Sequence, residues 1–197
     1  MFSLTIGSGA TLKLTGGTFT DDHGSGPGVN GGTIRVESGA TLAISGAIAD
    51  TGTGRILDDT GGTIDLNGGA ITGGKLAVAA GATLEATGGT ASSIATGNLI
   101  TNAGTLEASG GATLTITDAI RNAATGILLA DGGSLILDGA VTGGAATITD
   151  GGTLDLHSAA TLTSVSFAGA GSLVLDDPRA LHGAIAGFGA GDTIDLK

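Results

Sequence analysis

The hydrophobic and polar positions of this chain alternate in a short phrase that returns along its whole length. In each copy, Thr or Ser is followed by two mostly aliphatic residues that flank one variable position. The eleven copies begin at Thr11, Thr33, Thr41, Thr63, Thr83, Thr105, Thr113, Ser134, Thr153, Ser172 and Thr193. Successive side chains of a strand point to opposite faces, so this period of two predicts short β-strands whose aliphatic residues point inward. No stretch has a helical period with capping residues, and the chain is therefore expected to be all-β.

The spacing of the phrases predicts how these strands are arranged. For nine phrases between Leu12 and Ile194, the intervals from one aliphatic residue to the next are 30, 22, 20, 30, 21, 19, 19 and 21 residues. A period of about 20 residues is typical of a solenoid, in which each coil buries its apolar residues only against the neighbouring coils. Further apolar pieces, at 127–129 and at Val141 on either side of 134–137, indicate about three short strands per turn. The sequence thus predicts one β-solenoid domain over residues 1–197, with about 20–22 residues per turn and roughly 8–9 turns.

The two 30-residue intervals are interpreted as loop insertions near residues 20–30 and 89–104. The first contains Asp21, Asp22 and His23, followed by the turn-forming residues Gly-Ser-Gly-Pro-Gly at 24–28. Loops on rigid scaffolds often carry recognition, so this loop is expected to project from the solenoid. Asp21, Asp22 and His23 are therefore the candidate binding residues.

Composition narrows the class of protein. Leu, Ile, Val and Phe make up about a quarter of the chain, which is enough for an ordered core, and the 40 glycines fit sharp corners. A net charge of −11 with only seven Lys and Arg argues against nucleic-acid binding. There is no cysteine, which excludes thiolate metal sites, and no apolar run long enough to predict a transmembrane helix.

Acidic pairs are the obvious candidates for catalysis. They occur at Asp21–Asp22, Asp58–Asp59 and Asp176–Asp177. Glycoside hydrolysis needs two carboxyl groups about 5 to 9.5 Å apart around a sugar, whereas adjacent residues of an extended chain point apart. The pairs are therefore interpreted as solvated turn residues, and no catalytic residue is assigned. His157 and His182 have no second histidine at ligand spacing, so they are interpreted as isolated surface residues and no metal site is assigned.

The outward-facing position of the phrase raises two further alternatives. Asp65 and Glu85 occupy it in successive coils, and strands about 4.8 Å apart would place them in a carboxylate ladder that favours calcium. The Gly-Gly-x-Gly-x-Asp repeat of calcium-binding β-rolls is absent. Thr or Ser begins every phrase, as on an ice-binding face, but only the phrase at 113–116 has Thr at both outward positions. Calcium binding and ice binding are kept as alternatives.

Several phrases resemble the repeats of one family. They are Ile-Thr-Asn-Ala-Gly-Thr-Leu-Glu-Ala at 100–108, Ile-Arg-Asn-Ala-Ala-Thr-Gly-Ile at 120–127, Asp-Gly-Gly-Thr-Leu-Asp-Leu at 150–156, and the segment 185–196. These are similar to repeats of bacterial autotransporter passengers and filamentous-haemagglutinin-like adhesins, and the resemblance covers nearly the whole chain. It implies a right-handed, single-stranded parallel β-helix on the outside of a Gram-negative cell. The family's secretion segments are not recognised in this sequence, so the chain is expected to be a fragment of a longer repeat protein.

The resemblance implies a structural or adhesive role without catalysis, in a secreted or cell-surface protein. The expected partners are a host glycan or matrix protein, and exposed strand edges at the ends of a solenoid also favour end-to-end self-association. Parallel β-helices also occur in enzymes, so a polysaccharide-active, pectinase-like enzyme is the alternative function. Aromatic residues are 2% of the chain, with no Trp or Tyr, which leaves little to stack on a sugar ring.

Overall fold

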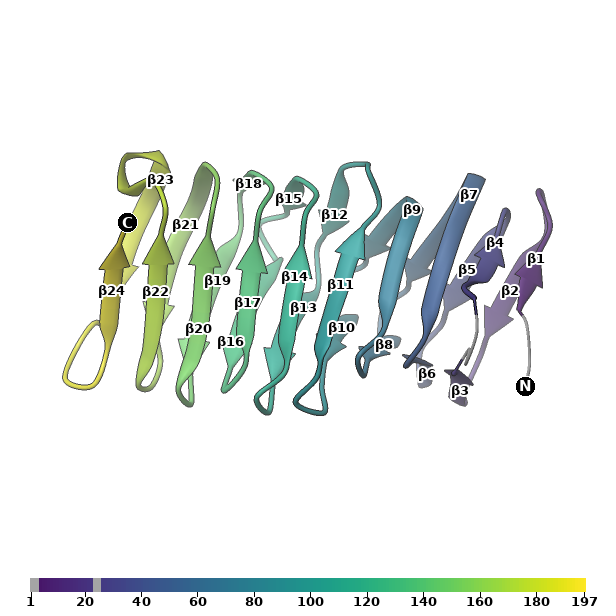
Figure 1. Ribbon diagram of the computed structural model, residues 1–197, viewed down its shortest axis with the longest axis horizontal. Helices are drawn as coiled ribbons and strands as arrows, with labels where there is room; N and C mark the ends of the chain where they lie inside the picture. Colours follow the sequence, from purple (N-terminus) through teal and green to yellow (C-terminus); the bar gives the residue numbers. More distant parts are fainter. Residues whose placement is uncertain (1–3, 23–25) are drawn as a thin grey trace.

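The computed structural model describes residues 4–22 and 26–197. The chain winds into a parallel β-solenoid of about nine turns with 2% helix, which confirms the all-β solenoid prediction. Figure 1 shows the coils side by side, from the purple amino-terminal end to the yellow carboxyl-terminal end. The 24 strands found in these described residues are joined by hydrogen bonds into one continuous sheet that wraps around the core.

Each coil contributes to three columns of stacked parallel strands, which we name A, B and C. Column A contains β1 (Thr5–Ile6), β4 (Gly28–Asn30), the first parts of β7 (Ala47–Asp58) and β9 (Ala70–Val78), β11 (Ala91–Ala95), β14 (Thr113–Ile116), β17 (Ser134–Leu137), β20 (Gly152–Leu156), β22 (Gly171–Leu175) and β24 (Thr193–Leu196). Column B contains β2 (Thr11–Leu14), β5 (Thr33–Val36), the second parts of β7 and β9, β12 (Ile100–Asn102), β15 (Ile120–Asn122), β18 (Val141–Thr142) and the first parts of β21 (Ala160–Phe167) and β23 (Leu181–Ala186). Column C contains β3 (Gly17–Asp21), β6 (Ala40–Ile44), β8 (Thr63–Leu66), β10 (Thr83–Ala86), β13 (Thr105–Ser109), β16 (Ile127–Asp131), β19 (Ala145–Thr149) and the second parts of β21 and β23.

The columns give a different origin for the two 30-residue intervals. Leu84 pairs with Leu106 in column C, and Leu114 lies on the next strand of the same coil, in column A. The interval from Leu12 to Leu42 likewise passes from column B to column C. Each interval is therefore one coil plus one strand, and the insertion predicted near 89–104 is wrong, because β11 and β12 are regular members of their columns.

The other predicted insertion, near 20–30, falls partly on residues 23–25, which lie outside the described residues. On either side of them, β3 pairs with β6 in column C and β4 pairs with β7 in column A. The strands that flank this segment therefore occupy ordinary places in the stack.

The interior of the solenoid is one continuous aliphatic cluster. Within the phrases from Thr41 to Leu175, buried and partly exposed residues alternate, and side chains such as Ile34, Leu84 and Leu114 are fully buried. They pack against the equivalent residues of the coils before and after, so the buried set runs from Ile6 to Leu175 without a break. This confirms that the aliphatic positions point inward, and it means that each coil is stabilised mainly by its neighbours.

Repeated turns join the columns. Between columns B and C, three successive coils use equivalent turns at residues 37–40, 59–62 and 79–82, each with a glycine in the left-handed region. Gly39 N donates to the Gly61 carbonyl oxygen (2.8 Å), and Gly61 N donates to the Gly81 carbonyl oxygen (3.0 Å). The residues that end column B before these turns are Val36, Asp58 and Val78, and they pair with one another.

Helical structure is confined to one short 3-10 turn, Pro178–Ala180, within the part of the chain that the structure describes. The Asp177 side chain caps this turn by accepting a hydrogen bond from Arg179 N (3.0 Å). No described helix has the length and apolar character needed to cross a membrane.

Candidate functional site

The predicted binding loop is only partly described by the structure. Asp21 ends β3 and is 3% exposed, and its backbone oxygen accepts hydrogen bonds from Ser45 N (2.9 Å) and Gly46 N (3.3 Å). Asp22 is exposed, and His23 lies outside the described residues. Asp21 therefore belongs to the wall of the solenoid and does not project from it, which corrects its place in the predicted loop.

The adjacent carboxylates have separate environments. Asp58 is 1% exposed, whereas Asp59 forms an ion pair with Arg35, with Nη2 and Oδ2 2.8 Å apart. Asp176 forms an ion pair with Lys197. The interpretation as solvated turn residues is wrong for Asp21 and Asp58, because both residues end their strands with the side chain buried.

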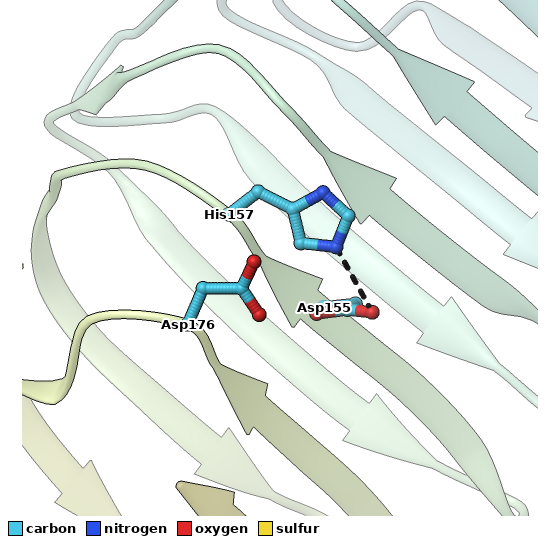
Figure 2. Close-up of side chains that lie close together, drawn as sticks. All are labelled: Asp155, His157 and Asp176. Atoms are coloured by element: carbon cyan, nitrogen blue, oxygen red, sulfur yellow. Dashed lines mark ion pairs between the residues drawn. The ribbon is translucent and has the colours of Figure 1, made fainter. Parts of the chain in front are cut away.

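Charged side chains gather where the last strands of column A end. Asp138, His157, Asp176 and Lys197 follow β17, β20, β22 and β24 directly, one in each coil, and Asp155 lies within β20. His157 Nδ1 is 2.7 Å from Asp138 Oδ1, and Nε2 is 3.2 Å from Asp155 Oδ2. Lys197 Nζ is 3.3 Å from Asp176 Oδ1 and 3.7 Å from Asp155 Oδ2. Figure 2 shows the imidazole next to Asp155 and Asp176.

The charges in this cluster compensate one another. Burial lowers the pKa of the His157 imidazole, but its hydrogen bonds to Asp155 and Asp138 and the nearby Asp176 charge outweigh burial, and the pKa is raised above its usual value. A protonated His157 gives the alternating series Asp138, His157, Asp176 and Lys197 along the column. Such a series favours the stacking of these coils, as opposite charges on neighbouring strands do.

The same cluster has the geometry of a metal site. Ligand atoms of Asp155, His157 and Asp176 lie within 4.8 Å of one another, and Asp138 accepts from the imidazole as an outer partner of a metal-bound histidine does. One nitrogen and two carboxylate oxygens would suit a divalent cation such as zinc. Lys197 and a protonated His157 would pair with these carboxylates, so the arrangement is explained without a metal.

The interpretation of His157 as an isolated residue is wrong. In a solenoid the neighbours of a side chain lie one coil away in the sequence, and the notable spacing is therefore about 20 residues rather than three or four. Asp138, His157, Asp176 and Lys197 each follow the final aliphatic residue of a phrase. Alignment of the phrase ends would have identified the series.

Asp138→Asn is expected to lower the pKa of His157, because the substitution removes the carboxylate that accepts from Nδ1 and raises that pKa. The titration of the His157 ring protons, followed by NMR, measures the change. Asp22→Asn is the control, since Asp22 is an exposed carboxylate in the first coils that follows β3, a strand of a different column. An unchanged His157 titration in Asp138→Asn would contradict the assigned hydrogen bond.

The predicted carboxylate ladder is present in column C. Glu85 pairs with Asp65 in one direction and with Glu107 in the other. Burial and the Asp65 charge raise the pKa of Glu85, and burial with the charges of Glu85 and Asp131 raises the pKa of Glu107. The group of three metal-ligand side chains found within the described residues lies at His157 and does not include this ladder. Calcium binding by the ladder therefore gains no support beyond its acidic charge.

The Thr and Ser residues that begin the phrases form three separate ranks. Thr11 and Thr33 pair in column B, Thr41, Thr63, Thr83 and Thr105 stack in column C, and the phrases from Thr113 to Thr193 stack in column A. The neighbouring outward position in column C is occupied by Ala43, Asp65, Glu85 and Glu107. Each rank is a single file, so the double rank of an ice-binding face is not formed.

A groove of about 540 Å³ follows the corner between columns A and B across the first coils. Its described lining consists of five glycines, three threonines, Arg55, Lys75 and Asn98. We name it the Arg55–Lys75 groove. Sequence reasoning missed it, because Arg55 and Lys75 are 20 residues apart and neither stands out alone.

Comparison with known proteins does not assign a family. No family model matches this chain, and no curated protein or solved structure does. Its function is therefore inferred from its own surface, of which the charge cluster at His157, the carboxylate ladder and the Arg55–Lys75 groove are the distinctive features.

Proposed function

We propose that this chain is a structural and adhesive segment of a secreted or cell-surface, autotransporter-like protein, and that it performs no catalysis. The observation that supports this proposal is the continuous aliphatic core, which runs through the coils without a break. Coils that depend on their neighbours in this way form an extended scaffold and display side chains in rows about 4.8 Å apart. Such rows suit the recognition of a long, repetitive ligand.

The carboxylates support binding more than polysaccharide cleavage. Asp58 and Asp21 are buried in the wall, Asp59 is paired with Arg35, and Asp176 is paired with Lys197. A glycosidase needs one carboxyl group that donates a proton and another that acts on the opposite side of the same sugar. A host glycan or matrix protein is therefore proposed as a partner rather than as a substrate.

The proposal is tested by a screen of the purified chain against a glycan array and a panel of matrix proteins, with and without calcium. Specific binding to one class of glycan or matrix protein is the expected result. Binding that needs calcium would favour the calcium alternative at the acidic surface. If the chain binds none of the glycans and matrix proteins, the adhesive role is contradicted. A purely structural role as a stalk would then be favoured.

End-to-end self-association is a second proposed interaction. Near the last strand, Phe188 is 54% exposed and Leu196 is 59% exposed, although Phe188 also packs edge-on against Phe167. Apolar side chains beside an unpaired strand edge favour association. Sedimentation over a range of concentrations is expected to show assemblies that Leu196→Lys reduces, and a monomer at all concentrations would contradict this interaction.

A further inference from the structure

We infer that the Arg55–Lys75 groove binds the carboxylate or sulfate groups of an acidic glycan. The inference rests on the proposed adhesive function, because it names the ligand class of the adhesive surface and the place where that ligand binds. It follows from the charges, the register and the shape of the groove.

The charge of the groove is opposite to that of the chain. The chain has 18 Asp and Glu against seven Lys and Arg. Lys13, Arg35 and Lys197 are ion-paired, whereas Arg55 and Lys75 have no ion pair among the described residues. None of the described residues that line the groove is acidic. Two cations without ion pairs, in a groove whose described lining has no carboxylate, provide a local site for an anion on a protein that otherwise repels anions.

The register brings the two cations together. Arg55 in β7 pairs directly with Lys75 in β9, so the two backbones are about 4.8 Å apart. Like charges directly opposite each other on neighbouring strands are destabilising. An anion between them removes this repulsion and gains charge-assisted hydrogen bonds from both side chains.

Arg55 is oriented for such a contact. Its Nε donates to Thr33 Oγ1 at 2.9 Å, which holds the guanidinium along the groove. The two terminal nitrogens make no hydrogen bond to a described residue and remain able to donate in parallel to two oxygens of one carboxylate or sulfate.

The floor of the groove is open backbone. Gly54 and Gly74 present backbone to the groove, and their Cβ positions face inward, where a Cβ on Gly74 would lie 2.2 Å from Asp50 Cβ. Asp50 itself lies beneath the floor, where it is 6% exposed and accepts from Asn30 Nδ2 at 2.6 Å. The volume of about 540 Å³ falls within the range of about 300–1,000 Å³ that is usual for ligand sites.

Charged side chains are also the main means by which this chain can bind a glycan specifically. It has no Trp or Tyr, so it lacks the side chains that most often stack on sugar rings. A neutral glycan would find few specific contacts in the groove, whereas a uronate or a sulfated sugar would find two cations.

The test is calorimetric titration of the whole chain with four probes: oligogalacturonate, sulfated dextran oligosaccharide, neutral dextran oligosaccharide and inorganic phosphate. Arg55→Gln and Lys75→Gln are each expected to weaken binding of the acidic oligosaccharide about tenfold, and the double variant to abolish it. Arg121→Gln is the matched control. Arg121 is an arginine of column B without an ion pair among the described residues, outside this groove, and its replacement is expected to change affinity less than twofold.

The probes distinguish the sources of the anion. Binding of oligogalacturonate alone assigns the groove to carboxylates, and binding of sulfated dextran alone assigns it to sulfates. Phosphate binding without oligosaccharide binding, equal binding of neutral dextran, or an acidic probe that still binds the double variant would each overturn the inference. If the double variant still binds the glycan array, the groove is not the binding site, but the adhesive function is still supported. If the wild-type chain binds nothing on the array, both proposals are contradicted.

Discussion

Asp58→Val is expected to raise the free energy of unfolding at pH 7 by about 3 kcal/mol. Asp58 is 1% exposed, and neither of its carboxyl oxygens has a hydrogen-bond partner among the described residues. A buried polar group without a partner costs about 1–3 kcal/mol, and burying a valine side chain gains about 1.5–3 kcal/mol. The substitution removes the cost of the unpaired carboxyl group and adds part of the gain from burying a valine side chain.

The coils on either side already carry valine at this position. Asp58 pairs with Val36 and with Val78, and the turns that follow all three residues have the same form. Asp58→Val therefore completes an existing valine stack without a new backbone conformation. The absence of a Cβ on Gly62 leaves space beside the new side chain, because a Cβ there would lie 2.4 Å from Asp58 Oδ1.

The effect of Asp58 depends on pH. Burial, and to a lesser degree the Asp59 charge, raises its pKa from 3.8 to about 8. A carboxyl group whose pKa is raised in the folded state stabilises the fold fully below about pH 4 and loses this contribution as the pH rises through about 8. The difference between Asp58→Val and the wild type is therefore expected to grow between pH 4 and pH 8.

Urea unfolding at pH 4, 6 and 8 measures this difference. Val78→Asp is the matched reverse variant, since it places a second unpaired carboxyl group in the same column, and it is expected to destabilise the protein. A loss of stability in Asp58→Val, or a pH dependence like that of the wild type, would contradict the burial of an unpaired carboxyl group at this position.

Asp50→Asn is expected to stabilise the protein by about 2 kcal/mol above pH 6. Asp50 occupies a corner position that resembles that of Asn122. Asn30 Nδ2 donates to Asp50 Oδ1 (2.6 Å) just as Asn102 Nδ2 donates to Asn122 Oδ1 (2.8 Å). The Asn122 amide goes on to donate to the Gly126 carbonyl oxygen (3.1 Å), which an ionised aspartate cannot do.

The equivalent acceptor beside Asp50 is the Gly54 carbonyl oxygen. Asp50 Oδ2 and this oxygen both lie 2.6 Å from the position that a Cβ on Gly74 would occupy. Within the part of the chain that the structure describes, Oδ2 has no hydrogen-bond partner. Burial raises the Asp50 pKa to about 6, although the Asn30 hydrogen bond lowers it. Asp50 thus stabilises the fold below about pH 4 and loses that contribution as the pH rises through about 6, whereas asparagine donates at every pH.

Thermal unfolding of Asp50→Asn at pH 5 and pH 8 tests this corner. The increase in melting temperature is expected to be larger at pH 8 than at pH 5. Asn122→Asp is expected to lower the melting temperature, and to lower it more at pH 8. Equal melting temperatures for the wild type and Asp50→Asn at pH 8 would contradict this account. They would show that a side-chain amide at position 50 gains no stabilising hydrogen bond to the Gly54 carbonyl oxygen.

The strands and the inward aliphatic residues were predictable because their signal is local. The alternation in phrases such as 63–66 is enough to place Ile64 and Leu66 in the core, as the structure does. The carboxylate ladder at Asp65 and Glu85 was also predictable, because these phrases follow each other within one column.

The assignment of phrases to columns was not predictable from the phrase alone. Leu12, Leu42 and Leu114 lie in columns B, C and A, yet their phrases look alike, since each column needs the same outward threonine and inward aliphatic pair. The interval between two phrases therefore does not show whether they are separated by one coil or by one coil plus one strand. This ambiguity led to the wrong prediction of an insertion near 89–104.

The burial of Asp58 was hidden by its surroundings in the sequence. The run Asp-Asp-Thr-Gly-Gly at 58–62 has the composition of a solvated turn. Alignment with Val36 and Val78, which precede equivalent turns one coil away, would have placed Asp58 in the core. The Arg55–Lys75 groove was missed for the same reason, because contacts in a solenoid join residues about 20 positions apart.

The central claim is that this solenoid holds an acidic glycan without cleaving it. The most direct measurement incubates the purified chain with polygalacturonate and then determines both the bound fraction and the length of the polysaccharide. We predict that the wild-type chain retains polygalacturonate at its original length. The double variant Arg55→Gln/Lys75→Gln is expected not to retain it. Shortened chains with new reducing ends, or no retention at all, would contradict the claim.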